Sequence, residues 1–242
     1  MFSWLEKNPF FFAVMVFIFI AYAGVIEILP DFANRARPLE GTKPPTVLQL
    51  AGKHVYMKDS CNACHTQQIR PFKAETDRYG MYSLSGEYAF DRPHLWGSKR
   101  TGPDLWRVGN YRTTDWHENH MKEPTSVVPG SIMPAYKHHF SNNADIETAY
   151  GEAVTTKKVF GVPYDVEGMP KLGTYEEAQA AAKEEAAAIV EEMKDEEVKK
   201  AFERGEIREI VALIAYLNSL KSANLWMRRL YEISKDTELL SF

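Results

Sequence analysis

The stretch Cys61-Asn62-Ala63-Cys64-His65 (CNACH) contains both cysteines of the 242-residue chain, and a histidine follows the second cysteine directly. Two cysteines are too few for a disulfide framework, and a bridge between them would close too small a loop to stabilise the fold much. Their role is therefore chemical. The spacing C-x-x-C-H is typical of the covalent attachment of a c-type haem.

Each position of this motif has a reason in haem chemistry. Cys61 and Cys64, three residues apart on one turn, can form thioethers with the two vinyl groups of a single haem, and His65 then lies under the iron as its proximal ligand. Half of a zinc site has the same spacing, but the sequence lacks a second cysteine pair. A thioredoxin-like redox pair is the other alternative, but no βαβ pattern surrounds the motif. Haem c is the favoured interpretation.

Two further segments supply the rest of the expected site. Residues 101–105 (TGPDL) have the look of the loop that supports the proximal histidine in class I cytochromes c, and the carbonyl of Pro103 would accept the proton of His65 Nδ1. Met133 is the expected sixth ligand, because it lies well after the histidine and the following proline stiffens its loop. The alternative ligands are His117, His120, His138 and His139. An iron held by histidine and methionine has no vacant position for oxygen, so we expect electron transfer and no catalytic residue in this chain.

The N-terminal run of residues 10–29 (FFFAVMVFIFIAYAGVIEIL) carries one charge, Glu27. As a helix it would be about 30 Å long, which matches the hydrocarbon core of a bilayer. A buried core helix is one alternative. A cleaved signal peptide is another, because residues 21–23 (AYA) resemble a cleavage site. The run continues past that site and its N-terminal flank is weakly basic, so an uncleaved membrane anchor is predicted.

The domain organisation follows from this anchor. The predicted parts are a cytoplasmic end (1–9), a transmembrane anchor (10–29), a proline-rich linker (30–45), a periplasmic cytochrome c domain (46–221) and a C-terminal tail (222–242). The flanking charges leave the orientation open. Covalent haem attachment takes place outside the cytoplasmic membrane in bacteria, so the N-terminus is expected in the cytoplasm and the domain in the periplasm.

The pattern along the domain predicts a mainly α fold of the class I cytochrome c type. We expect a helix through Leu48, Ala51, Gly52, Val55 and Tyr56 before the motif, and a short helix after Thr113 or Thr114. Residues 66–112 have no period and predict long structured loops, with an insertion at about 66–100. A capping box at Thr174 predicts an extra acidic helix over 174–204, and a last amphipathic helix is expected over 206–221. The net charge of −4 argues against nucleic-acid binding.

Three stretches carry a closer likeness: residues 61–80 (CNACHTQQIRPFKAETDRYG), 96–105 (WGSKRTGPDL) and 127–136 (VVPGSIMPAY). Together they resemble the membrane-anchored monohaem cytochrome c subunit of cbb3-type (C-family) cytochrome c oxidases. The match is close over about residues 46–140. Residues 161–164 (GVPY) and the terminal helix with VALIAYL (211–217) also fit.

The resemblance implies a cofactor and partners. The chain would be anchored in the bacterial inner membrane and would hold one haem c in its periplasmic domain through Cys61, Cys64, His65 and Met133. It would receive electrons from a dihaem cytochrome c subunit and pass them to the haem b of the catalytic haem–copper subunit, on which residues 67–99 would lie. The resemblance also suggests that Ser98 lends an oxygen to a calcium ion at the subunit boundary.

Several polar residues are candidates for the haem propionates. Arg70, Lys99 and Arg100 could neutralise them, and the indole N–H of Trp116 could donate to one. Three other functions stay open at this point: the haem c subunit of a nitric oxide reductase, a free membrane-tethered electron shuttle, and a haem-based gas sensor or peroxidase. The shuttle would need only a small contact surface, and the sensor or peroxidase would need an open iron position.

Overall fold

The computed structural model describes residues 2–33 and 37–221, so the predicted tail 222–242 lies outside the described residues. Over the described ranges the regular elements are helices and no strand forms, with one isolated antiparallel bridge between Asn143 and Arg208. The predicted mainly α fold class is confirmed. The chain divides into two compact units, residues 1–37 and 38–242, and the division falls inside the predicted linker.

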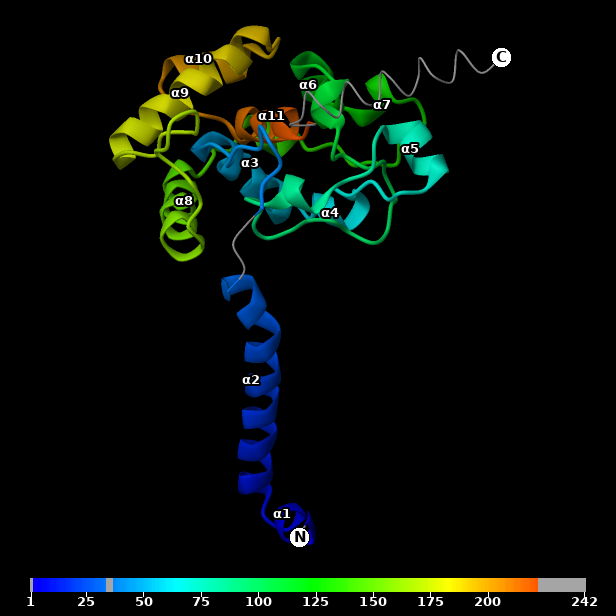
Figure 1. The fold of residues 1–242 in the computed structure, drawn as a ribbon. Helices are drawn as coiled ribbons and strands as arrows, with labels where there is room; N and C mark the ends of the chain where they lie inside the picture. The colour runs from blue at the N-terminus through cyan, green and yellow to red at the C-terminus, as the bar shows by residue number, and fades with distance from the viewer. Residues whose placement is uncertain (1, 34–36, 222–242) are drawn as a thin grey trace. The chain divides into compact units, whose positions relative to one another are not determined.

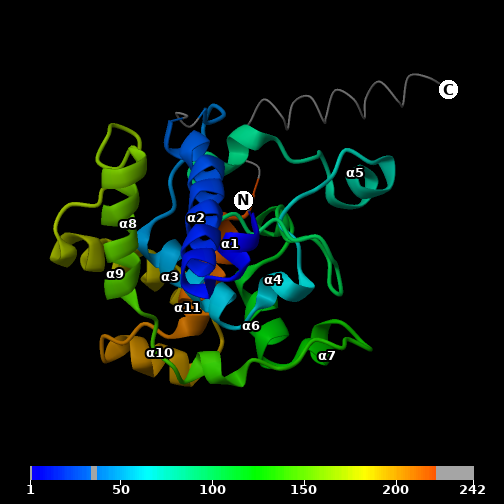
Figure 2. The ribbon, with the colours of Figure 1, turned by 90° about the horizontal axis from the view of Figure 1, so that it is seen from below.

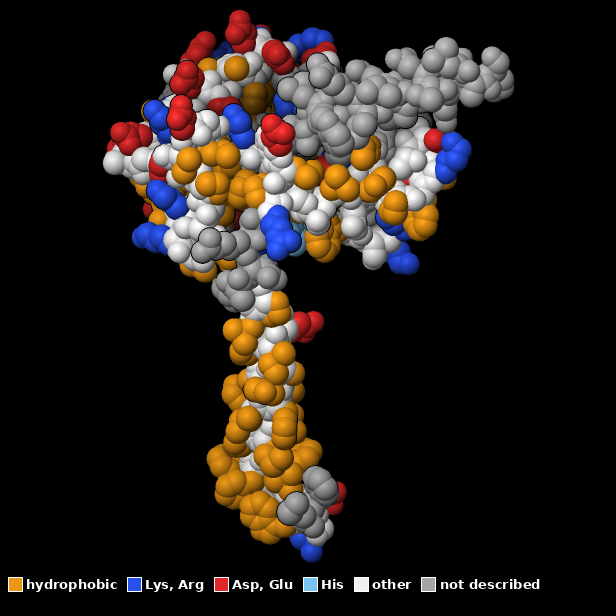
Figure 3. All heavy atoms as spheres, viewed as in Figure 1, with side chains coloured by type: hydrophobic (Ala, Val, Ile, Leu, Met, Phe, Trp, Pro, Cys, Tyr) orange, Lys and Arg blue, Asp and Glu red, His pale blue; other side chains and the backbone are white. Residues whose placement is uncertain are grey.

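The first unit is an apolar helix. The short helix α1 (Phe2–Glu6) precedes α2 (Pro9–Ala33), and Pro9–Pro30 is long and apolar enough to cross a membrane. None of this span is buried inside the protein, and apolar side chains cover the visible face of α2 in Figure 3. Twenty-two residues rise about 33 Å, so the helix matches a bilayer core in length.

The predicted start of the linker at residue 30 is wrong, because α2 continues through Pro30 to Ala33. Proline lacks one backbone N–H and disturbs the turn before it. At this position only the last turn of the helix follows, so the loss of one hydrogen bond is tolerated.

The second unit is organised around two crossing helices, α3 (Val47–Lys58) and α11 (Glu209–Ser219). A capping box between Thr46 and Gln49 begins α3. The crossing is close at Gly52, where a Cβ atom would lie 1.9 Å from the carbonyl oxygen of Ala212. The predicted buried face of α3 is confirmed for its apolar members Leu48, Ala51, Val55 and Tyr56.

The last helix is shorter than predicted but packs as predicted. It begins at Glu209 rather than Glu206, because Arg208 is its N-cap residue with extended backbone. Its inward side chains all lie in the core: Val211, Leu213, Ile214, Leu217 and Leu220. This helix therefore supplies much of the hydrophobic core on which the loops of the domain rest.

Other helices flank the α3–α11 pair. In Figures 1 and 2, one side of the pair is flanked by α8 (Ile146–Phe160), α9 (Tyr175–Glu192) and α10 (Glu196–Glu203). The other side is flanked by α5 (Lys73–Tyr79), α6 (Thr114–Lys122) and α7 (Pro124–Val127). Helix α8 (Ile146–Phe160) has no counterpart among the predicted elements. It packs on α3 and α9 and buries two alanines completely, Ala149 and Ala153.

The predicted acidic helix over 174–204 is two helices, α9 (Tyr175–Glu192) and α10 (Glu196–Glu203). The capping box at Thr174 is confirmed, but Met193 is extended and buried. The carboxylate of Glu118 on α6 accepts the backbone N–H groups of Lys194 (2.8 Å) and Asp195 (2.7 Å). Asp195 then caps α10, so a contact from a distant helix fixes the break.

Residues 66–112 form structured loops with short helices, as the lack of a period predicts. These helices are α5 and the 3-10 turns η1 (Ser85–Tyr88) and η2 (Val108–Asn110). Buried charges order the segment: the carboxylate of Glu87 accepts bonds from the guanidinium of Arg107 and from the indole N–H of Trp106. Charge-assisted hydrogen bonds of this kind stabilise a segment that has few backbone hydrogen bonds of the helical type.

Candidate functional site

The two cysteines lie on a single helical turn, α4 (Cys61–Cys64), which directly follows the end of α3. Ser60 adopts a left-handed backbone with φ 55° and turns the chain from α3 into α4. The Cys61 side chain is largely buried, the Cys64 side chain is exposed, and both thiols are free. Residues three apart on a helical turn share a face, so the two sulfur atoms are available to one partner.

The Cys61 thiol is unsuited to thiolate chemistry. Burial, together with the charge of Asp59, raises its pKa to about 12. Reactive redox cysteines have a pKa below the ordinary value, because a nearby positive charge or helix N-terminus stabilises the thiolate. The environment of Cys61 therefore weighs against the thioredoxin-like alternative.

The imidazole of His65 is held in one orientation. Its Nδ1–H donates to the carbonyl oxygen of Pro103 at 2.8 Å, which is the predicted contact, and Nε2 keeps its lone pair. Burial lowers the pKa of His65 and so favours the neutral ring. A Cβ atom on Gly102 would lie 2.3 Å from His65 Cε1. Only glycine leaves room for the ring at this position.

The loop 101–105 is docked through its backbone on the predicted haem-attachment turn, α4 (Cys61–Cys64), called the attachment turn from here on. The N–H groups of Thr101 and Gly102 donate to the carbonyl of Cys64 at 3.0 and 2.9 Å, and the N–H of Leu105 donates to the carbonyl of Thr66 at 2.9 Å. These three bonds fix the position of the loop relative to His65. They place the Pro103 carbonyl where Nδ1 can reach it.

Asp104 is a supporting residue that the sequence analysis does not identify. Its carboxylate is buried and accepts bonds from the hydroxyl of Thr66 (2.7 Å), the N–H of Gln68 (2.8 Å) and the N–H of Trp106 (2.9 Å). Its position directly after the Gly-Pro pair was the available signal. The carboxylate ties the residues after His65 to the loop that carries Pro103.

The structure gives Arg100 partners inside the chain. Its Nε donates to the Thr66 hydroxyl at 2.6 Å, and its Nη2 donates to Glu75 at 2.9 Å and to the carbonyl of Gln68 at 2.9 Å. Arg70 also pairs with Glu75. These bonds order the loop, and the role of the two arginines at the propionates stays a prediction.

Helix α6 presents a polar aromatic cluster. The ring of Trp116 stacks on His120 with centroids 4.4 Å apart, and the guanidinium of Arg112 lies 4.1 Å from the Trp116 centroid. His117 is 1% exposed, and neither of its ring nitrogens has a hydrogen-bond partner among the described residues. Burial lowers the pKa of His117 and of His120 to about 4.

The loop that carries Met133 lies beside the attachment turn. Met133 is half-buried against the core, and its N–H donates to the hydroxyl of Ser131 at 3.2 Å. The N–H of Tyr136 donates to the carbonyl of Met121 on α6 at 2.8 Å. Five residues after Met133, Nε2 of His138 lies 2.7 Å from the carboxylate of Asp59, which is two residues before Cys61.

The rival ligands differ from Met133 in their surroundings. The Nε2 atoms of His138 and His139 both contact the Asp59 carboxylate, and His120 is stacked on Trp116. The His117 ring packs edge-on against Trp116, and its two nitrogens have no hydrogen-bond partner in the described part of the chain. Met133 as the sixth ligand stays a prediction.

Comparison with known proteins decides the family. The profile described as "Cytochrome C oxidase, mono-heme subunit/FixO" matches residues 2–223. This chain belongs to that family. The match covers the apolar helix, the attachment turn and the Met133 loop in one span. No curated protein matches the chain.

Family membership makes the chain a cytochrome c oxidase subunit and implies a haem cofactor. The residues of the site fit such a group on three counts. Two free thiols share one turn, the imidazole of His65 is oriented with Nε2 unprotonated, and the buried nitrogens of His117 lack partners among the described residues. Buried polar atoms are normally paired, so His117 is suited to a polar group that this chain alone does not supply.

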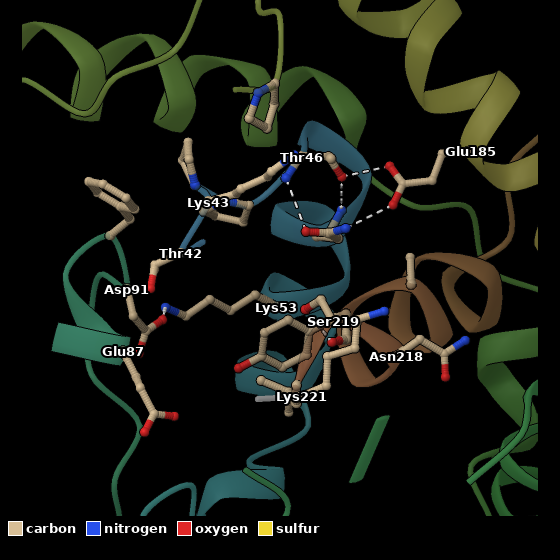
Figure 4. Close-up of a pocket in the computed structure, with 18 of the residues that line it drawn as sticks. Thr42, Lys43, Thr46, Lys53, Glu87, Asp91, Glu185, Asn218, Ser219 and Lys221 are labelled. Atoms are coloured by element: carbon tan, nitrogen blue, oxygen red, sulfur yellow. Dashed lines mark hydrogen bonds and ion pairs between the residues drawn. The ribbon is translucent and has the colours of Figure 1, made fainter. Parts of the chain in front are cut away.

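A cavity of about 640 Å³ lies elsewhere in the domain (Figure 4). Its walls come from residues 41–46, from α3 and α9, and from the end of α11. Glu185 bridges Thr46 and Gln49 at one side, and the ammonium of Lys53 bonds to Asp91 and to the carbonyl of Pro93 at the other. Neither the cysteines nor His65 line this cavity, so it is separate from the candidate haem site.

Ser98 is exposed and lies in the loop just before Arg100. Gly97, its neighbour, has φ 68°, which turns the chain sharply at this point. The predicted calcium contribution of Ser98 stays a prediction.

Proposed function

We propose that this family member carries one covalent haem c and relays single electrons inside a cbb3-type oxidase. Electrons would pass from a dihaem cytochrome c subunit, through this chain, to the haem b of the catalytic subunit. One observation carries the proposal. The ring of His65 is held by the Pro103 carbonyl and the bare backbone of Gly102, directly beside two free thiols. That arrangement leaves Nε2 of His65 available for an iron.

The residues of the site would have different roles at the haem. Cys61 and Cys64 would hold the haem through thioethers, each formed when a thiol adds across a vinyl group without loss of atoms. His65 and Met133 would fill the two axial positions. A bound haem supplies a one-electron carrier that cycles between ferrous and ferric iron.

The surroundings of His65 support electron transfer rather than bond chemistry. The hydrogen bond from Nδ1 to Pro103 strengthens Nε2 as a donor and keeps the tautomer fixed. The three backbone bonds under residues 101–105 hold the ring in place during a change of charge. Small structural change on oxidation and reduction favours fast transfer, so a rigid proximal side suits a relay.

The membrane anchor would place the relay beside its partners. Helix α2 would span the bacterial inner membrane once, with the N-terminus in the cytoplasm and the haem domain in the periplasm. The periplasm is where covalent haem attachment takes place in bacteria. An anchored domain stays at a fixed height above the bilayer, where the catalytic subunit is also embedded.

The segment 67–99 is the proposed contact with the catalytic subunit. It exposes large apolar side chains: Phe72 (58% exposed), Tyr82 and Trp96. Apolar surface of this kind is typical of an interface rather than of a free shuttle. Ser98, two residues after Trp96, would contribute an oxygen to a calcium ion at this boundary.

Covalent haem is the first test. The purified chain should give a pyridine haemochrome spectrum of the c type and a haem-stained band on a denaturing gel. The double variant Cys61→Ala/Cys64→Ala should lose both signals, while Ser98→Ala should keep them. A wild-type chain without covalent haem would contradict the proposal.

The axial assignment is tested by Met133→Ala. We expect the haem to stay attached, because the thioethers are unchanged. The sixth position should open, so the reduced protein should bind carbon monoxide, and the reduction potential should fall because a thioether ligand favours ferrous iron. Met169→Ala, a methionine of the loop 161–173, is the matched control. An unchanged low-spin spectrum in Met133→Ala would assign the sixth ligand to another residue.

A further inference from the structure

Asp59, His138 and His139 form a cluster that the proposed haem site does not use. Oδ2 of Asp59 lies 2.7 Å from Nε2 of His138 and 2.5 Å from Nε2 of His139. One ligand atom from each of the three side chains lies within 4.8 Å of the other two. Within residues 2–33 and 37–221, no second group of three such side chains meets this condition.

The fold builds this cluster from two distant segments. Asp59 is the C-cap residue of α3, and its backbone N–H donates to Val55. His138 and His139 belong to the 3-10 turn η3 (Lys137–Phe140). The His139 side chain is completely buried and stacks on Tyr136 with centroids 5.4 Å apart, whereas the His138 side chain is 44% exposed. The His139 imidazole is therefore fixed by packing, and the His138 imidazole is accessible to solvent.

The charge states suit a cation. Burial alone would raise the pKa of Asp59, but hydrogen bonds from His138 and His139 lower it below its ordinary value. Burial lowers the pKa of His139, which favours the neutral ring. A carboxylate and neutral imidazoles are the donors that zinc and similar divalent ions take in proteins.

We propose that Asp59, His138 and His139 bind one divalent transition-metal ion, with Zn²⁺ the best match to two nitrogen donors and one oxygen donor. Three protein ligands leave a fourth position for water. The site goes beyond the electron relay and does not depend on it.

Binding requires a small rearrangement. Metal–donor distances of about 2.0–2.2 Å in tetrahedral geometry put neighbouring donors about 3.3 Å apart. The imidazoles must therefore move away from the Asp59 oxygen by about 0.6–0.8 Å, and each ring must carry its hydrogen on Nδ1 instead of Nε2. No atom is lost in this tautomer change.

The tautomer change limits the affinity. Nδ1 of His139 is buried and has no partner among the described residues, so a hydrogen there would be an unpaired buried donor. Unpaired buried donors are costly, and metal-bound histidines usually donate their second N–H. We expect an exchangeable zinc ion, bound more weakly than in four-ligand structural sites.

Because of where the site lies, a bound ion should affect the stability of the chain. Asp59 lies two residues before Cys61, and His138 lies five residues after Met133. An ion shared by these residues would join the attachment turn to the loop that carries Met133. Zinc should then raise the melting temperature of the chain.

The experiment uses the full chain in mild detergent, purified with a tag that contains no histidine. Zinc binding is measured by equilibrium dialysis with metal analysis and by the zinc-dependent shift in melting temperature. Wild-type protein should bind one zinc ion that Asp59→Asn and His138→Gln bind at least ten-fold more weakly. His54→Gln is the matched control, because His54 also contacts a single carboxylate, that of Glu152.

The outcomes separate the site from general histidine binding. Equal zinc affinity in wild type, Asp59→Asn and His138→Gln would overturn the proposal, as would wild-type protein that binds no zinc. A loss confined to His54→Gln would do the same. If Asp59→Asn fails to fold, His138→Gln decides alone, because its side chain is half exposed and its replacement does not disturb the core.

Discussion

Gly102 illustrates how one missing side chain shapes the site. Its backbone lies against the imidazole of His65, where a Cβ atom would come within 2.3 Å of Cε1. The Pro103 carbonyl can therefore reach Nδ1 only if residue 102 has no side chain. The two residues act together, one as the surface under the ring and the other as its hydrogen-bond acceptor.

Gly102→Ala should displace His65 while the thioethers stay intact. Relief of the overlap requires the ring or the loop to move, at a cost of about 1–3 kcal/mol. We expect covalent haem at normal levels with a weakened proximal ligand, seen as a loss of the low-spin absorption spectrum. Thr101→Ala is the control, because it removes an exposed neighbouring side chain and keeps the backbone. A wild-type spectrum in Gly102→Ala would contradict this role.

Glu75 should make the stability of the domain depend on pH. Burial alone would raise its pKa, but bonds from Arg100 and Arg70 lower it to about 2. The folded pKa lies below the unfolded value, so the stabilisation is present at pH 7 and is lost as the pH falls from about 4.5 to about 2.

The matching substitution is Glu75→Gln, followed by melting curves from pH 7 to pH 2.5. We expect a loss of about 2 kcal/mol at pH 7 that shrinks toward zero in acid. Asp77→Asn removes an exposed partner of Lys73 and should change stability by less than about 0.5 kcal/mol. If the difference in unfolding free energy between wild type and Glu75→Gln stays constant with pH, the titration of Glu75 does not contribute to stability.

At the scale of the helices, the crossing of α3 and α11 sets the core of the domain. Gly52 lets the two backbones approach, since a Cβ atom there would lie 1.9 Å from the Ala212 carbonyl oxygen and 2.8 Å from Cβ of Tyr216. Backbone atoms cannot move aside as a flexible side chain can. The attachment turn follows α3 directly, so the crossing also positions Cys61.

Gly52→Ala should therefore destabilise the domain by about 3 kcal/mol or more, because the helices must separate and lose core contacts. Gly151→Ala is the matched control in the exposed part of α8, where a Cβ atom meets nothing within 4 Å. That change should stabilise the protein by about 0.5–1 kcal/mol through helix propensity. Thermal melting of both variants checks the pair, and equal melting temperatures would contradict the close crossing.

At the scale of the whole molecule, the proposed haem site depends on the proposed membrane anchor, because the two must reach the right compartment together. Under the proposed function, covalent attachment would require the domain outside the cytoplasm, and α2 is the helix of the described residues that could deliver it there. Loss of membrane insertion should therefore also remove the haem, although the two features lie in separate units.

The test is the double variant Phe17→Lys/Ile20→Lys. Each charge near the centre of a transmembrane helix costs about 2.5–3.5 kcal/mol on insertion, so the two together should prevent stable insertion. Carbonate extraction of membranes and a haem-stained gel measure the two consequences. Phe17→Leu/Ile20→Leu should behave like wild type. Haem at full level in the lysine variant would show that the anchor is not required for export.

The sequence alone determined the features whose physics is local. The C-x-x-C-H spacing, the apolar run of α2 and the capping box at Thr174 each depend on neighbours a few residues apart, so they could be read without coordinates. The contact between His65 and Pro103 is not local, but it was also predicted, because residues 101–105 resemble the loop that supports the proximal histidine in class I cytochromes c.

Only the tertiary structure decided the features that depend on distant residues. Glu118 breaks the acidic helix at residues 194–195, 76 and 77 positions away, while the local Ala/Glu/Lys composition favours continuation. Arg100 takes Glu75 and Thr66 as partners, which its own neighbours do not indicate. Asp59 meets His138 and His139 across about 80 residues. Packing selects these partners, because the energy of a contact depends on distance in space and not on separation along the chain.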